Sequence, residues 1–467
     1  MCLISSISEL ITGKIKINSI ISIGGWVRNR RHSKLGISFI NLYDGSYIND
    51  IQIIANSTLN NYKDDILSIT SGCSLNVTGK LKISLNKNIQ NYEIYATKIK
   101  ILGWVKNPGK YPISPKKHSL KYLRKVSHLR SRTTIISCLT RIRHNISLFI
   151  HNFLHKKNFF WVNTPLITTL DTEGSGKMFR VSTLDLKNFK YKKNMNIFKK
   201  DFFGKESFLT VSGQLNLETY ACSMSKVYTF GPTFRAENSN TKRHLAEFWM
   251  LELEIAFTNL KSLIIFAEKM LKKIFEYFLN FHKNEIILLS NKIEKNLFNK
   301  IEKVLLNKFD IIEYNEAINI LQNSKEKFLH FIKWGDDLSL EHERYLTNKY
   351  FNNSVIIFNY PKNIKAFYMY LNKDNKTVAS MDILLPDIGE IIGGSQRESR
   401  IDFLDKRLKE LKLNKDYYWW YRDLRKYGTV PHSGFGLGFE RLLSYMTGLH
   451  NIKDVIPFPR TPYNAKF

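Results

Sequence analysis

Two charged segments contain residue types that bind phosphorylated compounds. In the first, Arg235 and Glu237 lie two residues apart at the end of an apolar run. After a polar loop, Arg243 and His244 precede a second apolar run that begins at Phe248. An arginine fixed on a strand can stabilise charge on a phosphoryl oxygen, a loop Arg-His pair can close over outer phosphates, and an aromatic face can stack on a purine. The spacing predicts a nucleotide-binding hairpin, with a solvated surface hairpin as the alternative.

A second segment combines alternating glycines with an arginine. Gly434, Gly436 and Gly438 alternate with larger residues, which allows a backbone or a ligand to approach closely. The residues that follow have helical spacing and place Arg441 in the first helical turn. Alone, this pattern also fits a tight packing corner between a strand and a helix. Together with the hairpin, it predicts another arginine at the phosphate site.

Two carboxylates could hold a magnesium ion. Asp382 and Glu390 flank a short connection between two strand-like runs, which would bring both to one edge of a sheet. Mg²⁺ prefers few protein carboxylates, with phosphate and water as its other ligands. The alternative is a pair of unrelated acids at strand ends.

These side chains must be positioned by a larger framework, and 467 residues exceed what one compact core usually contains. Residues 1–103 show five short strand-like runs and one helix-like stretch near residues 59–68. This pattern predicts a small β-barrel of the OB type, a fold that binds single-stranded nucleic acid. The five runs are Ser22–Arg31, Ile37–Asp44, Ile51–Ile54, Cys73–Lys80 and Tyr92–Ile101.

The remaining residues divide into a connector and a large second domain. A glycine and two prolines, Pro108 and Pro112, predict a hinge over residues 104–130. Residues 131–467 form the expected second domain, with a helical segment at about residues 258–345. Within it, residues 142–159 have the pattern of an amphipathic helix, and Pro165 interrupts the strand-like run that follows.

The composition gives a net charge of +30, from 71 lysines and arginines against 41 aspartates and glutamates. Such an excess suits a polyanion, but the chain is rich in lysine, asparagine and isoleucine throughout, so we attribute most of it to compositional drift. The four cysteines form no CxxC pair, which favours reduced thiols without zinc or disulfides. Because no membrane-length apolar run and no signal-peptide pattern occurs, we expect a cytoplasmic protein.

Three segments resemble the motifs of a known enzyme class. The amphipathic helix with Phe160–Leu166, the charged hairpin and the glycine-rich segment resemble motifs 1, 2 and 3 of the class II aminoacyl-tRNA synthetases. An OB barrel ahead of such a domain resembles the subgroup of aspartyl, asparaginyl and lysyl enzymes. The resemblance implies an α+β multidomain fold, in which an N-terminal OB-type β-barrel precedes a catalytic domain with an antiparallel β-sheet flanked by helices. It also implies ATP as a substrate, tRNA as a partner and a homodimer formed through motif 1.

The resemblance further assigns roles around the nucleotide. It implies that Arg235 and Arg441 are catalytic and that Asp382 and Glu390 bind Mg²⁺. The residues implied to bind ATP are Arg235, Glu237, Arg243, His244, Phe248, Glu390, Gly438 and Arg441.

Other residues are implied to bind the amino acid and the anticodon. Ser212 and Gln214 would face the substrate ammonium, together with Glu173 on a glycine-flanked mobile loop. A turn-capping role is the alternative for Glu173. For Phe39 the alternative is core packing, and for Arg28 it is a solvated strand face. The barrel residues implied to bind the anticodon are Arg28, Phe39 and Gln52.

The choice of amino acid depends on few positions. Aspartyl enzymes carry a lysine three residues after the glutamine, whereas this chain has Leu217. Glu252 can accept hydrogen bonds from an amide NH2 but would repel a carboxylate, and Arg397 can donate to the amide carbonyl. Residues 389–400, 418–428 and 454–462 also resemble the asparaginyl enzymes. The resemblance therefore implies ATP-dependent attachment of L-asparagine to tRNA(Asn) through an asparaginyl-adenylate, with release of AMP and pyrophosphate.

Three other functions remain open on the sequence. Leu217 and Glu252 argue against an aspartyl or relaxed-specificity synthetase. A synthetase-derived enzyme that makes asparagine from aspartate would not need an anticodon-binding barrel. A non-catalytic RNA-binding relative is opposed by the intact charged residues of the two motifs and the carboxylate pair.

Overall fold

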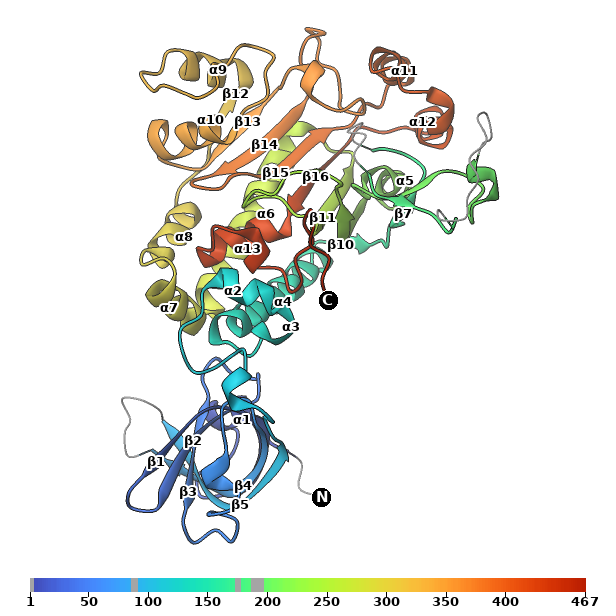
Figure 1. Cartoon of the computed structure of the whole chain (residues 1–467). Coiled ribbons are helices and arrows are strands. Elements are labelled where there is room, and N and C mark those ends of the chain that lie inside the picture. Colours follow the sequence, from blue (N-terminus) through green and yellow to red (C-terminus); the bar gives the residue numbers. More distant parts are fainter. Residues whose placement is uncertain (1–3, 85–90, 173–177, 186–196) are drawn as a thin grey trace. The chain divides into compact units, whose positions relative to one another are not determined.

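The computed structural model describes residues 4–84, 91–172, 178–185 and 197–467 (Figure 1). The chain divides into two compact units, Met1–Arg141 with Phe467 and Ile142–Lys466. The predicted hinge, residues 104–130, contains three short helices within the first unit, and its hinge role stays a prediction. In the described part of the chain, no helix has the length and apolarity needed to cross a membrane. The three short helices are η2 (Pro108–Lys110), α2 (Leu120–Lys125) and α3 (Ser127–Arg130).

A closed five-stranded barrel dominates the first unit, as the sequence predicted. Its strands follow the order β1-β2-β3-β5-β4, and buried residues alternate with outward ones at the two-residue period of a strand. In β3, Ile51 and Ile53 are buried inside the barrel and Gln52 faces outward. The strands are β1 (Ile20–Ser33), β2 (Ile37–Tyr43), β3 (Ile51–Asn56), β4 (Ser74–Ile83) and β5 (Tyr92–Gly103).

The prediction of a helix near residues 59–68 was wrong in its length. Only a short 3-10 helix, η1 (Ile66–Ser68), forms there, after a series of turns. Asn61 donates to the side chain of Asp65 and to the carbonyl of Ile99. Such side-chain hydrogen bonds compete with a helical backbone, which explains why this Asn- and Asp-rich stretch forms turns.

The second unit is built on an eight-stranded sheet in the order β12-β13-β14-β15-β16-β11-β10-β6. The predicted antiparallel arrangement holds for the central pairs, whereas β12·β13 and β10·β6 at the two ends are parallel. Long connections between these partners make parallel pairing possible. The strands are β6 (Phe160–Trp161), β10 (Lys226–Phe234), β11 (Glu247–Ala256), β12 (Asp310–Glu313), β13 (Val355–Phe358), β14 (Ser380–Leu385), β15 (Gly389–Gln396) and β16 (His432–Gly438).

A long helix covers one face of this sheet. Phe435 of β16 faces Phe266 of α6 at 6.4 Å between ring centres, whereas the adjacent Gly436 faces the side chain of Met250. Because neighbouring strand residues point to opposite faces, α6 covers one face and leaves the other for the site. The main helices are α4 (Thr134–His155), α5 (Gln214–Met224), α6 (Leu260–Phe281), α7 (Lys283–Lys292), α8 (Leu297–Leu306), α9 (Tyr314–Gln322), α10 (Leu340–Arg344), η4 (Tyr345–Tyr350), α11 (Ile401–Glu410), α12 (Trp419–Lys426) and α13 (Phe439–Thr447).

The expected helical segment, residues 258–345, contains α6 to α10 and also strand β12, which sequence analysis missed. Beside the main sheet, a small three-stranded sheet joins β7 (Ile167–Thr168), β9 (Ser207–Leu209) and β8 (Arg180–Val181).

The alternating glycines of β16 make room for side chains of β11. A Cβ atom at Gly434 would lie 2.2 Å from the Glu254 carboxylate and from the carbonyl oxygen of Leu253. At Gly436 it would lie 2.6 Å from the Met250 side chain. The close approach predicted for these glycines is therefore confirmed, and it lets two long side chains lie flat on the sheet.

We expect Gly434→Ala to lower the free energy of unfolding of the second unit by about 1–3 kcal/mol, because the new methyl group meets backbone as well as a buried carboxylate. Gly231→Ala in the neighbouring hairpin is the matched control, since no atom lies within 4 Å of its added Cβ. Denaturant unfolding followed by fluorescence measures both. Equal unfolding midpoints for the two variants would contradict this account.

Candidate active site

The β10–β11 hairpin carries the first charged segment, as predicted. The strands pair antiparallel with Phe234 opposite Glu247. Arg235 extends this pairing, because its amide donates to the carbonyl of Ala246 at 3.0 Å. The Arg235 guanidinium carbon lies 5.4 Å from the ring centre of Phe248. The arginine and the aromatic ring therefore form one wall whose position is fixed by the strands.

The loop between the two strands is held by His244. Its Nε2 lies 3.8 Å from a carboxylate oxygen of Glu237, and its Nδ1 lies 2.6 Å from the hydroxyl of Thr241. Burial lowers the pKa of His244, and nearby arginines act in the same direction against Glu237. An anion bound beside these groups would reverse the effect and favour the protonated ring.

One pocket brings together all eight residues predicted to bind ATP: Arg235, Glu237, Arg243, His244, Phe248, Glu390, Gly438 and Arg441. Four apolar residues outside the predicted set, Leu245, Met250, Ile391 and Ile452, also line it. The position of Met250 could have been inferred, because it lies two residues after Phe248 on the same strand face. Ile452 comes from the short helix η7 (Ile452–Asp454), and its local sequence gave no such signal. A pocket with three arginines and an aromatic ring suits a nucleoside polyphosphate.

Two of these arginines lie close enough to repel each other. Arg441 donates from Nη1 to the Glu390 carbonyl at 3.0 Å and to its carboxylate at 3.1 Å. Burial lowers the pKa of Arg243, and the charge of Arg441 lowers it further. Glu343 opposes this from 3.8 Å. An anion placed between the two guanidinium groups would relieve their repulsion.

The predicted carboxylate pair converges on one point of the sheet. Asp382 on β14 pairs with Gly393 on β15, and a Cβ at Gly393 would lie 2.9 Å from Glu390 Oε1 and 3.4 Å from Asp382 Oδ1. The second oxygens are engaged: Lys365 Nζ lies 2.7 Å from Asp382 Oδ2, and Arg441 contacts Glu390 Oε2. The glycine thus leaves space beside two hard oxygen donors, which fits Mg²⁺. Among the described residues no group of three or more such ligands occurs, so phosphate and water would have to complete the coordination.

The pKa values of the two carboxyl groups are shifted in opposite directions. Burial raises the pKa of Asp382 to about 6, with Lys365 opposing it and the charge of Glu390 adding to it. Burial also opposes ionisation of Glu390, but Arg441 and Lys365 outweigh it and lower the pKa of Glu390. A divalent cation between the two would favour both carboxylates.

Glu343 is a third acid at this end of the pocket and was not predicted. Its carboxylate accepts a hydrogen bond from the amide of Glu390 at 3.4 Å and occupies the space where a Cβ of Gly389 would lie. Burial raises the pKa of Glu343 to about 8, and Glu390 adds to the effect. Because α10 supplies this residue from 47 positions away, no local pattern could have placed it here.

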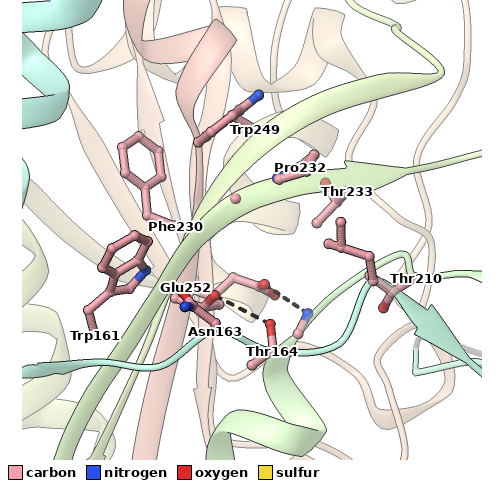
Figure 2. Close-up of a pocket in the computed structure, with 13 residues that line it drawn as sticks. Trp161, Asn163, Thr164, Thr210, Phe230, Pro232, Thr233, Trp249 and Glu252 are labelled. Atoms are coloured by element: carbon pink, nitrogen blue, oxygen red, sulfur yellow. Dashed lines mark hydrogen bonds between the residues drawn. The ribbon is translucent and has the colours of Figure 1, made fainter.

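Glu252 lies on the same strand face as Phe248, nearer the middle of β11. It accepts a hydrogen bond from the hydroxyl of Ser212. It accepts a second from the amide of Gly213 at 2.9 Å, drawn as a dashed line in Figure 2. Burial raises the pKa of Glu252, whereas Ser212 and Gly213, and the charges of Arg235 and Arg397, lower it. The carboxylate therefore lies between the nucleotide wall and the predicted amino-acid residues.

Arg397 is less available than the sequence suggested. It is buried and forms a salt bridge from Nη2 to Oε1 of Glu254 at 2.5 Å. Its Nε also contacts Glu254, and its Nη1 donates to the hydroxyl of Ser395 at 2.7 Å. Only the remaining N–H groups could reach a substrate, and its contact with the amide stays a prediction.

Gln214 begins α5 beside Ser212, as the predicted amino-acid segment requires. Its backbone amide donates to Ser212 Oγ at 3.1 Å, and its side-chain Nε2 donates to Glu218 at 3.1 Å. Leu217 does not face this polar group but lies in an apolar cluster with Ala221. The apolar side chain of Leu217 therefore suits its apolar surroundings, where a lysine would be buried without a partner. Glu173 lies outside the described residues.

The barrel presents two of its three predicted residues on one outer face. Phe39 and Gln52 face outward, with Arg31 opposite Phe39 across β1 and β2. Arg28 is not among them, because a bulge between Val27 and Asn29 shifts the strand. The structure thus brings Arg31, which sequence analysis missed, to the position expected for Arg28.

Arg28 itself is engaged elsewhere in the first unit. Its guanidinium carbon lies 3.6 Å from the ring centre of Tyr43, and Nη1 lies 3.9 Å from Asp50. These contacts give Arg28 a packing role in the barrel.

The motif 1 segment borders a second pocket. Figure 2 labels Trp161, Phe230, Trp249, Pro232 and Thr210 among the residues that line it. Trp161 retains 55% of its surface exposed. An exposed aromatic ring beside a pocket is typical of surfaces that bind another protein.

Comparison with known proteins gives a consistent result over the whole chain. A family model described as "tRNA synthetases class II (D, K and N)" matches residues 119–462, and one described as "OB-fold nucleic acid binding domain" matches residues 21–102. The chain is 60% identical to Asparagine--tRNA ligase of Buchnera aphidicola subsp. Schizaphis graminum, over 99% of both chains. It is 54% identical to Asparagine--tRNA ligase of Escherichia coli O139:H28, again over 99% of both.

A solved structure supports the same assignment. The asparaginyl-tRNA synthetase of Pyrococcus horikoshii, complexed with asparaginyl-adenylate, has 30% sequence identity to this chain and a TM-score of 0.86, with 100% of both chains covered. On these matches the chain belongs to the class II tRNA synthetases of the D, K and N group.

Proposed function

We propose that this chain attaches L-asparagine to tRNA(Asn) in two steps, through an asparaginyl-adenylate. The observation that carries the proposal is the pocket that collects all eight expected ATP-binding residues. Its full-length relatives named Asparagine--tRNA ligase support the choice of amino acid.

In the first step, the α-carboxylate of asparagine attacks the α-phosphorus of ATP, and pyrophosphate leaves. Arg235 holds the α-phosphate and orients the attacking carboxylate, while Phe248 and Glu237 hold the adenosine. Arg441, Arg243 and the loop histidine bind the outer phosphates. The chain contributes positioning and electrostatic stabilisation and forms no covalent bond to the substrate. Asp382 and Glu390 would hold Mg²⁺, which neutralises phosphate charge when bound.

The amino-acid end of the site selects an amide side chain. Glu252 is buried and accepts hydrogen bonds from Ser212 and Gly213, which fix its position. When ionised, it is a negatively charged acceptor. It accepts from the NH2 of asparagine and repels the carboxylate of aspartate. Arg397 donates to the amide oxygen through N–H groups that Glu254 and Ser395 leave available.

In the second step, the terminal ribose of tRNA attacks the adenylate, and the barrel holds the anticodon. The outer face with Asn29, Arg31, Phe39, Asn41 and Gln52 supplies one cation, one aromatic ring and three amides, a combination that stacks on and reads unpaired bases. We also propose a homodimer formed through α4 and β6, since Trp161 of β6 borders the pocket of Figure 2. We further propose that the chain works in the cytoplasm, as expected for a protein that charges tRNA.

The proposal is tested by ATP–pyrophosphate exchange with purified protein and Mg²⁺ in the absence of tRNA. We expect exchange with asparagine and not with aspartate or lysine, because Glu252 offers an acceptor to an amide. Exchange with aspartate alone would refute the specificity argument and leave the fold and chemistry intact. Folded protein without any exchange would instead favour a role in RNA binding.

Arg235→Ala should lower the kcat of asparagine-dependent exchange by about 100- to 1,000-fold, the usual cost of losing a donor that stabilises transition-state charge. Arg180→Ala is the matched control, because Arg180 pairs with Glu206 on the exposed small sheet. Steady-state exchange kinetics measure both variants. An Arg235→Ala enzyme as active as the control would refute the role of Arg235.

Arg31→Ala should raise the KM for tRNA about tenfold and leave exchange without tRNA unchanged, because one charge-assisted contact is lost from the anticodon face. Arg28→Ala should chiefly lower the thermal stability of the barrel, since it removes the contacts with Tyr43 and Asp50. Aminoacylation kinetics and thermal unfolding separate the two effects. A larger tRNA defect in Arg28→Ala than in Arg31→Ala would contradict the assignment.

A further inference from the structure

A buried carboxylate lies behind the amino-acid end of the site. Glu218 on α5 has 0% of its surface exposed. It accepts hydrogen bonds from Gln214 Nε2 at 3.1 Å, from the Tyr421 hydroxyl at 2.8 and 2.9 Å, from Arg425 Nη2 at 2.8 Å and from His432 Nε2 at 2.8 Å. These donors come from α5, α12 and β16, so one carboxylate joins three elements.

The ionised state of Glu218 is strongly favoured. Burial opposes the charge, but Arg425 and then His432 outweigh it and hold the pKa of Glu218 well below its ordinary value. An ionised carboxylate can only accept hydrogen bonds, and its two oxygens offer about four acceptor sites. Four donor groups therefore use essentially all of its capacity.

This arrangement fixes the orientation of the Gln214 amide. Because Glu218 cannot donate, the NH2 end of the amide must face it, and the carbonyl oxygen must turn the other way. No group in the described ranges donates to that oxygen. Nearby, Ser212 Oγ accepts from the Gln214 backbone amide and donates to Glu252. Gln214 therefore adjoins the residues proposed to bind asparagine.

We propose that Glu218 is a positioning residue that makes Gln214 a hydrogen-bond acceptor for the α-ammonium of the substrate. The proposal rests on the function proposed above. An acceptor-only contact favours an ammonium, which donates with its full charge, over a neutral hydroxyl at the same carbon. Glu218 thereby contributes to the selection of an α-amino acid without touching it.

Glu218→Gln should reverse the Gln214 amide. Its new carbonyl would remain with Arg425 and His432, which need an acceptor, and its new NH2 would face Gln214. Gln214 would then turn its oxygen inward and present its own NH2 to the substrate. An NH2 group repels an ammonium but can donate to a hydroxyl oxygen.

The test compares two ligands in ATP–pyrophosphate exchange by the full chain. L-asparagine is the substrate, and 2-hydroxysuccinamic acid, with a hydroxyl in place of the α-ammonium and the same side-chain amide, is the competitive inhibitor. In Glu218→Gln we expect the KM for asparagine to rise about tenfold, while the inhibition constant of the hydroxy acid changes less than about twofold. The KM for ATP should stay unchanged.

Glu254→Gln is the matched control, because it alters the other fully buried Glu–Arg pair of this sheet face. It should weaken asparagine and the hydroxy acid equally, since both carry the amide that Arg397 is proposed to bind. Equal weakening of both ligands by Glu218→Gln would mean that Glu218 has only a structural role and would overturn the inference. A wild-type protein without asparagine-dependent exchange would overturn the proposed function itself.

Tyr421→Phe provides a second variant if Glu218→Gln does not fold. It removes one donor from Glu218 and keeps the buried charge, so thermal unfolding should change little. Because Glu218 stays an acceptor-only carboxylate, the Gln214 NH2 must still face it, so we expect the KM for asparagine and the inhibition constant of the hydroxy acid both to change less than about twofold. A selective rise in the KM for asparagine in folded Tyr421→Phe would overturn the proposal, since the Gln214 amide would then not be oriented by the charge of Glu218.

Discussion

Buried charge is the constraint on which the second unit depends. Glu218 and Glu254 lie almost wholly out of solvent, and each is bound by an arginine, Arg425 and Arg397 respectively. Removing one partner from such a pair leaves an uncompensated charge that costs several kcal/mol. The pairs therefore hold α5, β11, α12 and the end of β15 in one arrangement. A site on these elements is preorganised before any ligand arrives.

The two ends of the site treat charge differently. At the amino-acid end, buried acids and bases satisfy one another, and only single acceptor or donor positions stay open. At the nucleotide end, the positively charged Arg243 and Arg441 lie close together. Glu343 lies 3.8 Å from Arg243, and Glu390 lies 3.1 Å from Arg441. The first end suits a small zwitterion that must be distinguished by its hydrogen bonds. The second suits a polyanion that supplies the missing negative charge.

Glycine spacing joins these two ends. On β16, the absence of side chains at Gly434 and Gly436 accommodates Glu254 and Met250 from the adjacent strand. On β15, Gly393 leaves space beneath the two predicted metal carboxylates. The sheet can thus present long charged side chains from β11 and β14 on a surface flat enough for an extended ligand. Larger residues at these positions would fill the site with protein.

The sequence by itself determined most of the local structure. Strand alternation predicted the barrel, and the eight residues expected to bind ATP line one pocket. They could be grouped from the sequence because each motif lies within one hairpin or one strand-to-helix junction, where the backbone period decides which side chains share a face. The carboxylate pair was predicted for the same reason, from two strands joined by a short turn.

Only the tertiary structure decided which distant residues complete the site. Because β1 has a bulge between Val27 and Asn29, Arg31 and not Arg28 lies beside Phe39 on the outer face of the barrel. Glu343 reaches Glu390 from a helix 47 residues away, and His432 reaches Glu218 across 214 residues. The parallel edges of the sheet also depend on long crossovers. Such contacts follow from how whole elements pack and from the need of each buried charge for a partner, and the local periodicity of a chain encodes neither.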